Sequence, residues 1–187
     1  FGFISNSFSA DFDKGLDAAN SGDYVTALKE WRPLAEQGNA KAQFSLGFMY
    51  KNGKGVTQDY KEAVKWYRLS AEQEFAPAQF SLGNSYHNGQ GVSIDKVKAM
   101  YWYNKASNNG SIEATHNLAN MLISEQDKDD IKPDWKRAET LFKEVIKNGN
   151  KRTLVPARTS LGWIYLMADD KWGVKNYKLA HKWSVKG

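Results

Sequence analysis

A stretch of 36 residues occurs twice in tandem, and this repetition constrains the fold more than any other feature of the sequence. Residues 42–77 and 78–113 align without a gap and share 15 identical residues. The series continues in weaker form, with an alanine at the first position of each further unit: Ala114 and Ala157. A period of this length is typical of helical repeat proteins, in which a single unit buries its apolar face only by stacking on its neighbours.

Each unit of the repeat predicts two helices joined by a glycine-rich turn. In the first complete unit, Leu46, Gly47 and Tyr50 form one buried stripe at helical spacing. Gly47 lacks a side chain where the second helix would cross the first closely. Residues 52–56, Asn-Gly-Lys-Gly-Val, then end the helix because asparagine and glycine tolerate left-handed backbone. Asp59 follows where the second helix needs an N-cap.

The sequence therefore predicts an all-α fold, a right-handed α-solenoid of about five antiparallel helical hairpins. No stretch rich in Pro, Ser or Gly is long enough to separate two domains, so one solenoid is expected over 11–187. The hairpins are expected at about 11–41, 42–77, 78–113, 114–156 and 157–187. The hairpin over 114–156 is longer than the others, which predicts an acidic loop over 124–133 and an extended linker over 150–156.

Residues 1–10 have a different character from the repeats. Residues 1–4 are apolar, and Ser7 and Ser9 place small residues before Ala10 as at a signal-peptide cleavage site. This leader predicts a remnant of a signal peptide and a periplasmic or secreted bacterial protein. A disordered leader on a cytoplasmic protein is the alternative.

Composition excludes several classes of site. The chain has no Cys, which excludes a disulfide framework, thiol catalysis and Cys-ligated zinc, and its three His have no metal-binding spacing. No metal, cofactor or catalytic residue is predicted, and no apolar run is long enough for a membrane span. Residues 132–187 carry 13 Lys/Arg against 5 Asp/Glu. These cations lie at helical intervals rather than in a cluster, so nucleic-acid binding is not favoured.

The repeat carries a recognisable pattern, A-x-x-x-L-G-x-x-Y-x-x-G-x-G-V-x-x-D-x-x-x-A-x-x-W-Y. Its first copy consists of Ala42, Leu46, Gly47, Tyr50, Gly53, Gly55, Val56, Asp59, Ala63, Trp66 and Tyr67. Its second copy consists of Ala78, Leu82, Gly83, Tyr86, Gly89, Gly91, Val92, Asp95, Ala99, Trp102 and Tyr103. The pattern resembles that of the Sel1-like repeat family, which is related to the tetratricopeptide repeats. The unit that begins at Ala114 departs most, since it lacks the paired loop glycines.

The resemblance implies a non-enzymatic scaffold or adaptor that holds a partner protein or peptide in its concave groove. One cysteine-rich branch of the family is reported as penicillin-binding, and this chain lacks that hallmark. The alternative function is nevertheless a cell-wall or β-lactam-ligand binding protein or enzyme of the bacterial envelope. The chain also stops at a second helix without a polar capping helix, so either the chain is cut short or a homodimer forms through this end.

In a solenoid of this kind the first helix of each hairpin lines the groove, and the positions beside the buried stripe face a partner. The predicted groove residues are Phe44, Phe48, Lys51, Asn52, Phe80, Asn84, His87, Asn88, His116, Asn120, Thr159 and Trp163. The rings would receive side chains of an extended peptide, and the amides would bond its backbone. For Phe44 and Phe80, packing between repeats is an equally good interpretation.

Overall fold

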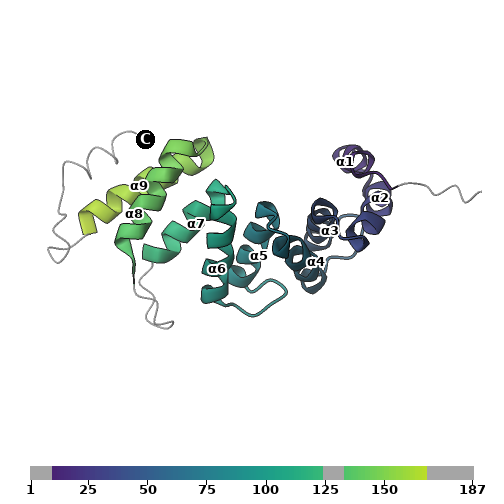
Figure 1. Ribbon diagram of the computed structural model, residues 1–187, viewed down its shortest axis with the longest axis horizontal. Coiled ribbons are helices and arrows are strands. Elements are labelled where there is room, and N and C mark those ends of the chain that lie inside the picture. The colour runs from purple at the N-terminus through teal and green to yellow at the C-terminus, as the bar shows by residue number, and fades with distance from the viewer. Residues whose placement is uncertain (1–9, 124–132, 168–187) are drawn as a thin grey trace, which may run out of the picture. The chain divides into compact units, whose positions relative to one another are not determined.

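The computed structural model describes residues 10–123 and 133–167, and every regular element in these residues is an α-helix (Figure 1). Helix contacts divide the chain into two units, with the division between Asp95 and Lys96. The first unit contains α1 (Phe12–Asn20), α2 (Tyr24–Glu36), α3 (Ala40–Asn52), α4 (Tyr60–Glu72) and α5 (Ala76–Asn88). The second contains α6 (Lys96–Asn108), α7 (Ile112–Ile123), α8 (Trp135–Asn148) and α9 (Lys151–Met167).

The N-cap expected at Asp59 is present, and two further second helices have a capping aspartate in the same place. Asp23, Asp59 and Asp134 each accept hydrogen bonds from backbone N–H groups in the first turn of α2, α4 and α8. These carboxylates satisfy donors that have no partner within the helix. At the other end, α3 and α5 stop at Gly53 and Gly89, whose backbone is left-handed. The capping signals in the sequence therefore set the helix bounds.

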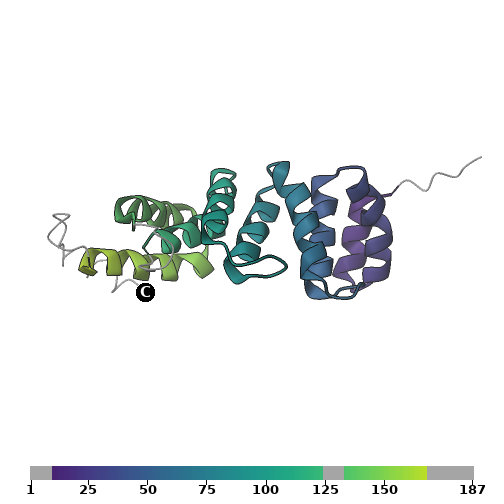
Figure 2. The same ribbon diagram turned by 90° about the horizontal axis from the view of Figure 1, so that it is seen from below.

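In the first unit each helix packs on the next, and Figure 2 shows α1 to α4 side by side. The helices of a hairpin approach each other at a glycine. A Cβ on Gly47 would lie 2.5 Å from a ring atom of Tyr67, which is 1% exposed. Gly15 in α1 is likewise covered by the ring of Trp31 from α2. The predicted close crossing at Gly47 is confirmed, and an aromatic ring on the second helix is what fills it.

The second glycine of each turn makes a contact between repeats. Gly55 lies against the backbone and Cβ of Tyr24, and Gly91 lies against the backbone of Tyr60, one repeat further on. Both have positive φ, 70° and 76°. A side chain at either position would be strained and would also collide with the start of the preceding second helix. The Gly-x-Gly pairs are therefore structural turns that dock one repeat on the previous one.

Two kinds of hydrogen bond recur between consecutive hairpins of this unit. The buried amides of Gln43 and Gln79 donate to the carbonyls of Ala35 and Ala71, over 3.0 and 3.1 Å. Each bond joins the start of a first helix to the end of the preceding second helix. A second pair, with the same 36-residue offset, runs from Arg32 to the Tyr50 hydroxyl and from Arg68 to the Tyr86 hydroxyl.

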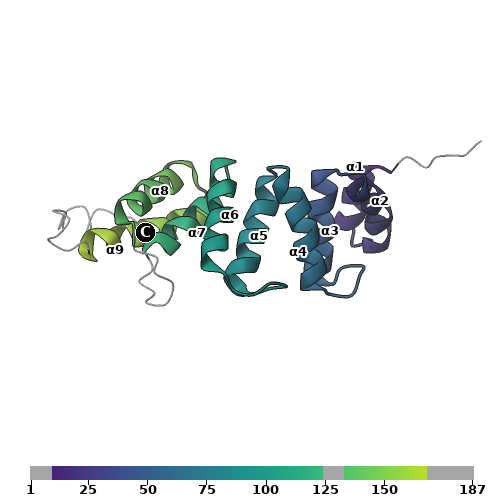
Figure 3. The same cartoon turned by 60° about the horizontal axis from the view of Figure 1, so that its bottom comes forward.

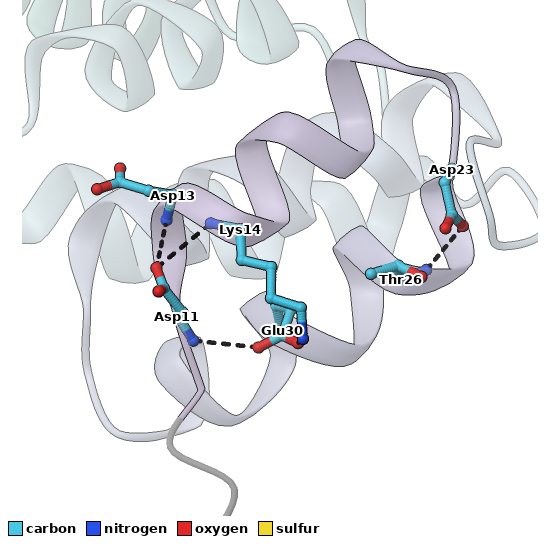
Figure 4. Close-up of polar contacts among 6 residues, drawn as sticks. All are labelled: Asp11, Asp13, Lys14, Asp23, Thr26 and Glu30. Carbon is cyan, nitrogen blue, oxygen red and sulfur yellow. Dashed lines mark hydrogen bonds and ion pairs between the residues drawn. The ribbon is translucent and has the colours of Figure 1, made fainter.

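A buried carboxylate ties the first helix to the second (Figure 4). Glu30 of α2 is 2% exposed and accepts hydrogen bonds from the Lys14 ammonium, over 2.6 Å, and from the backbone N–H of Asp11, over 3.1 Å. The bond from Lys14, followed by the bond from Asp11, lowers the pKa of Glu30. Because its charge is compensated twice, the carboxylate can stay ionised in a buried position.

In the second unit α7 contacts α6, α8 and α9, as Figure 3 allows the reader to follow. Helix α9 is joined to α8 by the Tyr165 hydroxyl, which donates to Glu139 over 2.6 Å, and Lys143 pairs with the same carboxylate oxygen. The linker expected over 150–156 is wrong, because α9 begins at Lys151 and continues through Pro156. Asn150 starts the helix by accepting a hydrogen bond from the backbone N–H of Arg152, a capping signal that the sequence interpretation missed.

The predicted all-α repeat solenoid is confirmed as the fold class, while its right-handed sense stays a prediction. Among the described residues, no helix is long and apolar enough to cross a membrane. Residues 1–9 of the leader, most of the expected acidic loop and the expected second helix of the last hairpin lie outside the described residues. The expected homodimer through that helix is therefore a prediction still.

Candidate functional site

On α3 the four predicted groove residues have unequal environments. Phe48 and Asn52 are exposed, whereas Phe44 and Lys51 are half-buried. The ring of Phe44 lies 5.8 Å from that of Tyr67 and 5.5 Å from that of Phe75, measured between centroids. These contacts give Phe44 a packing role, as one of the two interpretations of the sequence expected. The side-chain amide of Asn52 donates to the carbonyl of Phe48 over 2.8 Å and so completes the last turn of the helix.

Beside Phe48 lies a cation that sequence reasoning did not single out. Lys54, in the turn after α3, donates a hydrogen bond to the Tyr24 hydroxyl over 2.8 Å. Its ammonium also lies 4.8 Å from the Tyr24 ring centroid and 5.5 Å from that of Phe48. Both distances are within the range of cation–π attraction. The turn thus places a positive charge over an exposed aromatic ring.

On α5 the predicted set is more polar. His87 and Asn88 are exposed, and Phe80 and Asn84 are half-buried. Asn84 is equivalent to Phe48 one repeat earlier, so the same helical position carries an amide here and a ring there. The backbone at this position therefore does not require an apolar side chain.

In the second unit, His116, Asn120 and Ser160 form a polar chain between α7 and α9. The Ser160 hydroxyl donates to the Asn120 carbonyl oxygen over 3.3 Å, and the Asn120 amide lies 3.3 Å from the His116 ring. The imidazole packs edge-on against Phe142, with centroids 5.9 Å apart. Burial lowers the pKa of His116, although a hydrogen bond with Asn117 acts in the opposite direction. The ring is therefore neutral at neutral pH, and the chain links two helices without an evident reactive group.

The remaining predicted residues, Thr159 and Trp163, are exposed on α9. The Thr159 hydroxyl donates to the carbonyl of Val155 one turn back. Trp163 stacks at a tilt on Trp135 of α8, with ring centroids 5.5 Å apart. This pair was not predicted from the sequence, because Trp135 lies on a different helix and 28 residues away.

The structure reveals one position that unites several of these residues. In every first helix it directly follows the buried small residue of the stripe: Gly15, Gly47, Gly83, Ala119 and Gly162. We name this position the first-helix row, which consists of Leu16, Phe48, Asn84, Asn120 and Trp163. Leu16 was not among the predicted residues, because the shorter first hairpin obscured its register. The covering of Gly15 by Trp31, equivalent to that of Gly47 by Tyr67, establishes the register.

The first-helix row places large apolar side chains in solvent. Leu16, Phe48 and Trp163 are 42%, 44% and 39% exposed. Single exposed apolar residues are ordinary, but Leu16 and Phe48 share this register on consecutive first helices of the first unit, and Trp163 has it on α9 of the second. The row therefore provides apolar contacts on α1 and α3 in the first unit and on α9 in the second.

The titratable groups show packing rather than reaction chemistry. Burial raises the pKa of Tyr103 to about 12 and also raises that of Tyr67, because a buried phenolate loses its hydration. Within residues 10–123 and 133–167, no three His, Asp or Glu side chains gather as ligands for a metal ion. What the described residues offer to a ligand is apolar area, amides and a few cations.

The fold and these contacts define the class of α-helical repeat proteins. The Sel1 repeat matches residues 40–75, 76–111 and 155–186, together more than half of the chain, and the chain belongs to the Sel1 repeat family. The resemblance seen in the sequence is thus confirmed. The first two matches begin at the first residues of α3 and α5. No curated protein matches the chain.

Solved structures agree with this assignment. A Sel1 repeat protein from Oxalobacter formigenes is similar, with a TM-score of 0.80 and 27% identity over 92% of this chain and 68% of that one. A protective antigen of uropathogenic Escherichia coli strains, which displays an SLR fold, has a TM-score of 0.59 and 27% identity. The match covers 92% of this chain and 44% of the antigen, so the chain spans less than half of that protein.

Proposed function

We propose that this protein is a non-enzymatic scaffold that holds an extended segment of a partner protein against its first helices. Sel1 repeats typically serve as protein-interaction modules, which supports the general role. The first-helix row is the observation that supports this particular surface. The residue before each member of the row is small and buried, whereas the member itself differs from one helix to the next. In such a repeat scaffold the buried small residues hold the helices together, and the exposed positions beside them can differ to recognise a partner.

The chemistry of the row suits a peptide more than a small polar ligand. Phe48 and Trp163 offer ring faces, which carry much of the binding energy in protein interfaces. Asn84 and Asn120 lie half-buried at the same register, and an asparagine amide has two donors and two acceptor lone pairs, more than the bonds of Asn120 to His116 and Ser160 use. An extended peptide needs both apolar and polar contacts, because its side chains pack on apolar surface and its backbone groups require hydrogen bonds.

No observation favours the cell-wall or β-lactam-ligand alternative.

Both similar structures come from bacteria, which supports a bacterial protein, and export stays a prediction from residues 1–10. The partner is thus expected in the envelope or outside the cell.

Photo-crosslinking tests the surface directly. A benzophenone amino acid is placed at Phe48 or Trp163 and, as matched controls, at Leu69 of α4 or Tyr101 of α6, which are 45% and 53% exposed on second helices. Each variant is irradiated in an extract of the source cells. We expect one protein crosslinked from the first-helix positions and absent from the controls. Equal crosslinking from both sets, or crosslinking from the controls alone, would refute this surface.

A further inference from the structure

An ammonium group in the first unit lies between two aromatic rings without a counter-ion. Lys54 contacts Tyr24 and Phe48, and Lys51 stands one helical turn from Phe48 on α3. Neither lysine forms an ion pair with any carboxylate of residues 10–123 and 133–167. A lysine ammonium has three N–H donors, and the Tyr24 hydroxyl accepts from one of those of Lys54. Two of its N–H donors are therefore left for a further acceptor.

The next repeat shows whether the fold needs a positive charge at this position of the turn. One repeat later, Gln90 occupies the position of Lys54, between Gly89 and Gly91, which have the same left-handed backbone as the earlier pair. Tyr60 there corresponds to Tyr24. The turn therefore forms with a neutral side chain, and its docking depends on the glycines. The positive charge of Lys54 is an addition that folding does not require.

We propose that Lys54 binds an acidic side chain of the partner segment while an adjacent large apolar side chain packs on Phe48. This inference rests on the proposed function and specifies the chemistry of the segment. A carboxylate complements a cation that lacks an acidic partner, and a charge-assisted hydrogen bond gains strength beside apolar rings, where water is partly excluded. The side chain next to the acid then packs on the exposed part of the Phe48 ring, because the Lys54 ammonium lies over that ring, 5.5 Å from its centroid.

The carboxylate comes from a side chain inside the segment rather than from a chain terminus. Helix α3 is the second of the three first helices in this unit, after α1 and before α5. Leu16 on α1 carries an exposed apolar side chain at the register of Phe48. A segment that contacts Leu16, Phe48 and the same register on α5, Asn84, passes α3 in its middle, so its end does not lie there.

A peptide-display selection against the full chain tests the inference, with the library fused so that no free carboxyl terminus exists. Selected sequences are synthesised with acetylated and amidated ends and measured by fluorescence anisotropy. The variants are Lys54→Gln, which copies the natural Gln90, Lys54→Arg, Phe48→Ala and, as a matched control, Lys61→Gln on α4. Each peptide is also made with its acid replaced by the corresponding amide.

We expect the selected peptides to share an acidic residue next to a large apolar one. Lys54→Gln should weaken binding about tenfold, Lys54→Arg much less, and Lys61→Gln not at all. The amide peptide should bind the wild type about tenfold more weakly and bind the Lys54→Gln variant as well as the acidic peptide does, because the pair is then already broken.

Two results overturn the inference in distinguishable ways. Peptides whose binding depends on Phe48 but not on Lys54 or on an acid would remove the carboxylate site and leave the proposed function standing. If no selected peptide is sensitive to Phe48→Ala, or none is selected at all, both the carboxylate site and the proposed surface are wrong.

Discussion

The substitution Gly47→Ala tests whether close approach at the helix crossing holds each hairpin together. Alanine is the better helix former, so in an exposed helix this change would stabilise the protein by about 1 kcal/mol. At Gly47 the added methyl group would instead lie 2.5 and 2.6 Å from two ring atoms of Tyr67 and 3.2 Å from the carbonyl oxygen of Ala63. A loss of stability would therefore show that close packing outweighs helix propensity at Gly47, and a gain would show the reverse.

The geometry sets the magnitude. Carbon atoms in contact are about 3.5–4.0 Å apart, so the ring of Tyr67 or the α4 backbone must move by about 1 Å. Tyr67 is 1% exposed and has no free space to enter. Overpacking of this kind costs about 2–3 kcal/mol, and subtracting the gain in helix propensity leaves a net loss of about 1–2 kcal/mol. For a chain of this length the melting temperature should fall by roughly 3–8 °C.

Thermal and urea unfolding, followed by circular dichroism, measure the loss. The matched background is Tyr67→Leu, because a smaller side chain gives the methyl group room. In that background Gly47→Ala should be neutral or stabilising, and the difference between the two backgrounds gives the coupling energy. If Gly47→Ala stabilises the wild-type protein, or costs the same in both backgrounds, the crossing is not limited by the ring and the reasoning fails.

Three further predictions concern the repeat contact and the two perturbed groups. Gly91→Ala should lower the melting temperature by several degrees, because a Cβ there meets the Tyr60 backbone at a φ of 76°, and an unchanged melting temperature would show that the turn does not dock there. The folded-state pKa of Glu30 lies below its ordinary 4.5, so its stabilising effect is complete above that pH and is lost as the pH falls through the lower value. Glu30→Gln should therefore flatten the loss of melting temperature between pH 6 and pH 3 that the wild type shows, whereas parallel curves would contradict the bond with Lys14. The pKa of His116 is also lowered, from 6.5, so the wild type should lose stability as the pH falls below 6.5, and His116→Gln should lose less between pH 8 and pH 5; an equal loss would place the imidazole in solvent.

The helices themselves could be predicted well from the sequence. The repeat, the aspartate caps and the paired glycines are local signals, and each acts within a few residues of the helix end that it determines. The prediction failed at 150–156, where the extra length of the hairpin over 114–156 had indicated an extended linker and α9 continues through Pro156 instead. A proline lacks one backbone donor, but the packing of α9 on α7 and α8 compensates for the lost bond.

The candidate site could be predicted only in part. The spacing of Gly47 and Gly83 gave Phe48 and Asn84 by register, and the same logic gave Asn120 and Trp163. Leu16 was missed because the first hairpin is shorter. Its register becomes visible only when Trp31 is seen to lie on Gly15.

What the sequence by itself determined is the kind of fold, because a 36-residue period with small residues, caps and turn glycines at fixed places leaves a stacked helical hairpin as the stable solution. The tertiary structure decided which side chains meet across hairpins. It places Lys54 between Tyr24 and Phe48, 30 and 6 residues away along the chain, and Trp135 on Trp163. Such contacts depend on how one repeat docks on the previous one, and docking follows from the combined packing of many side chains rather than from any local pattern.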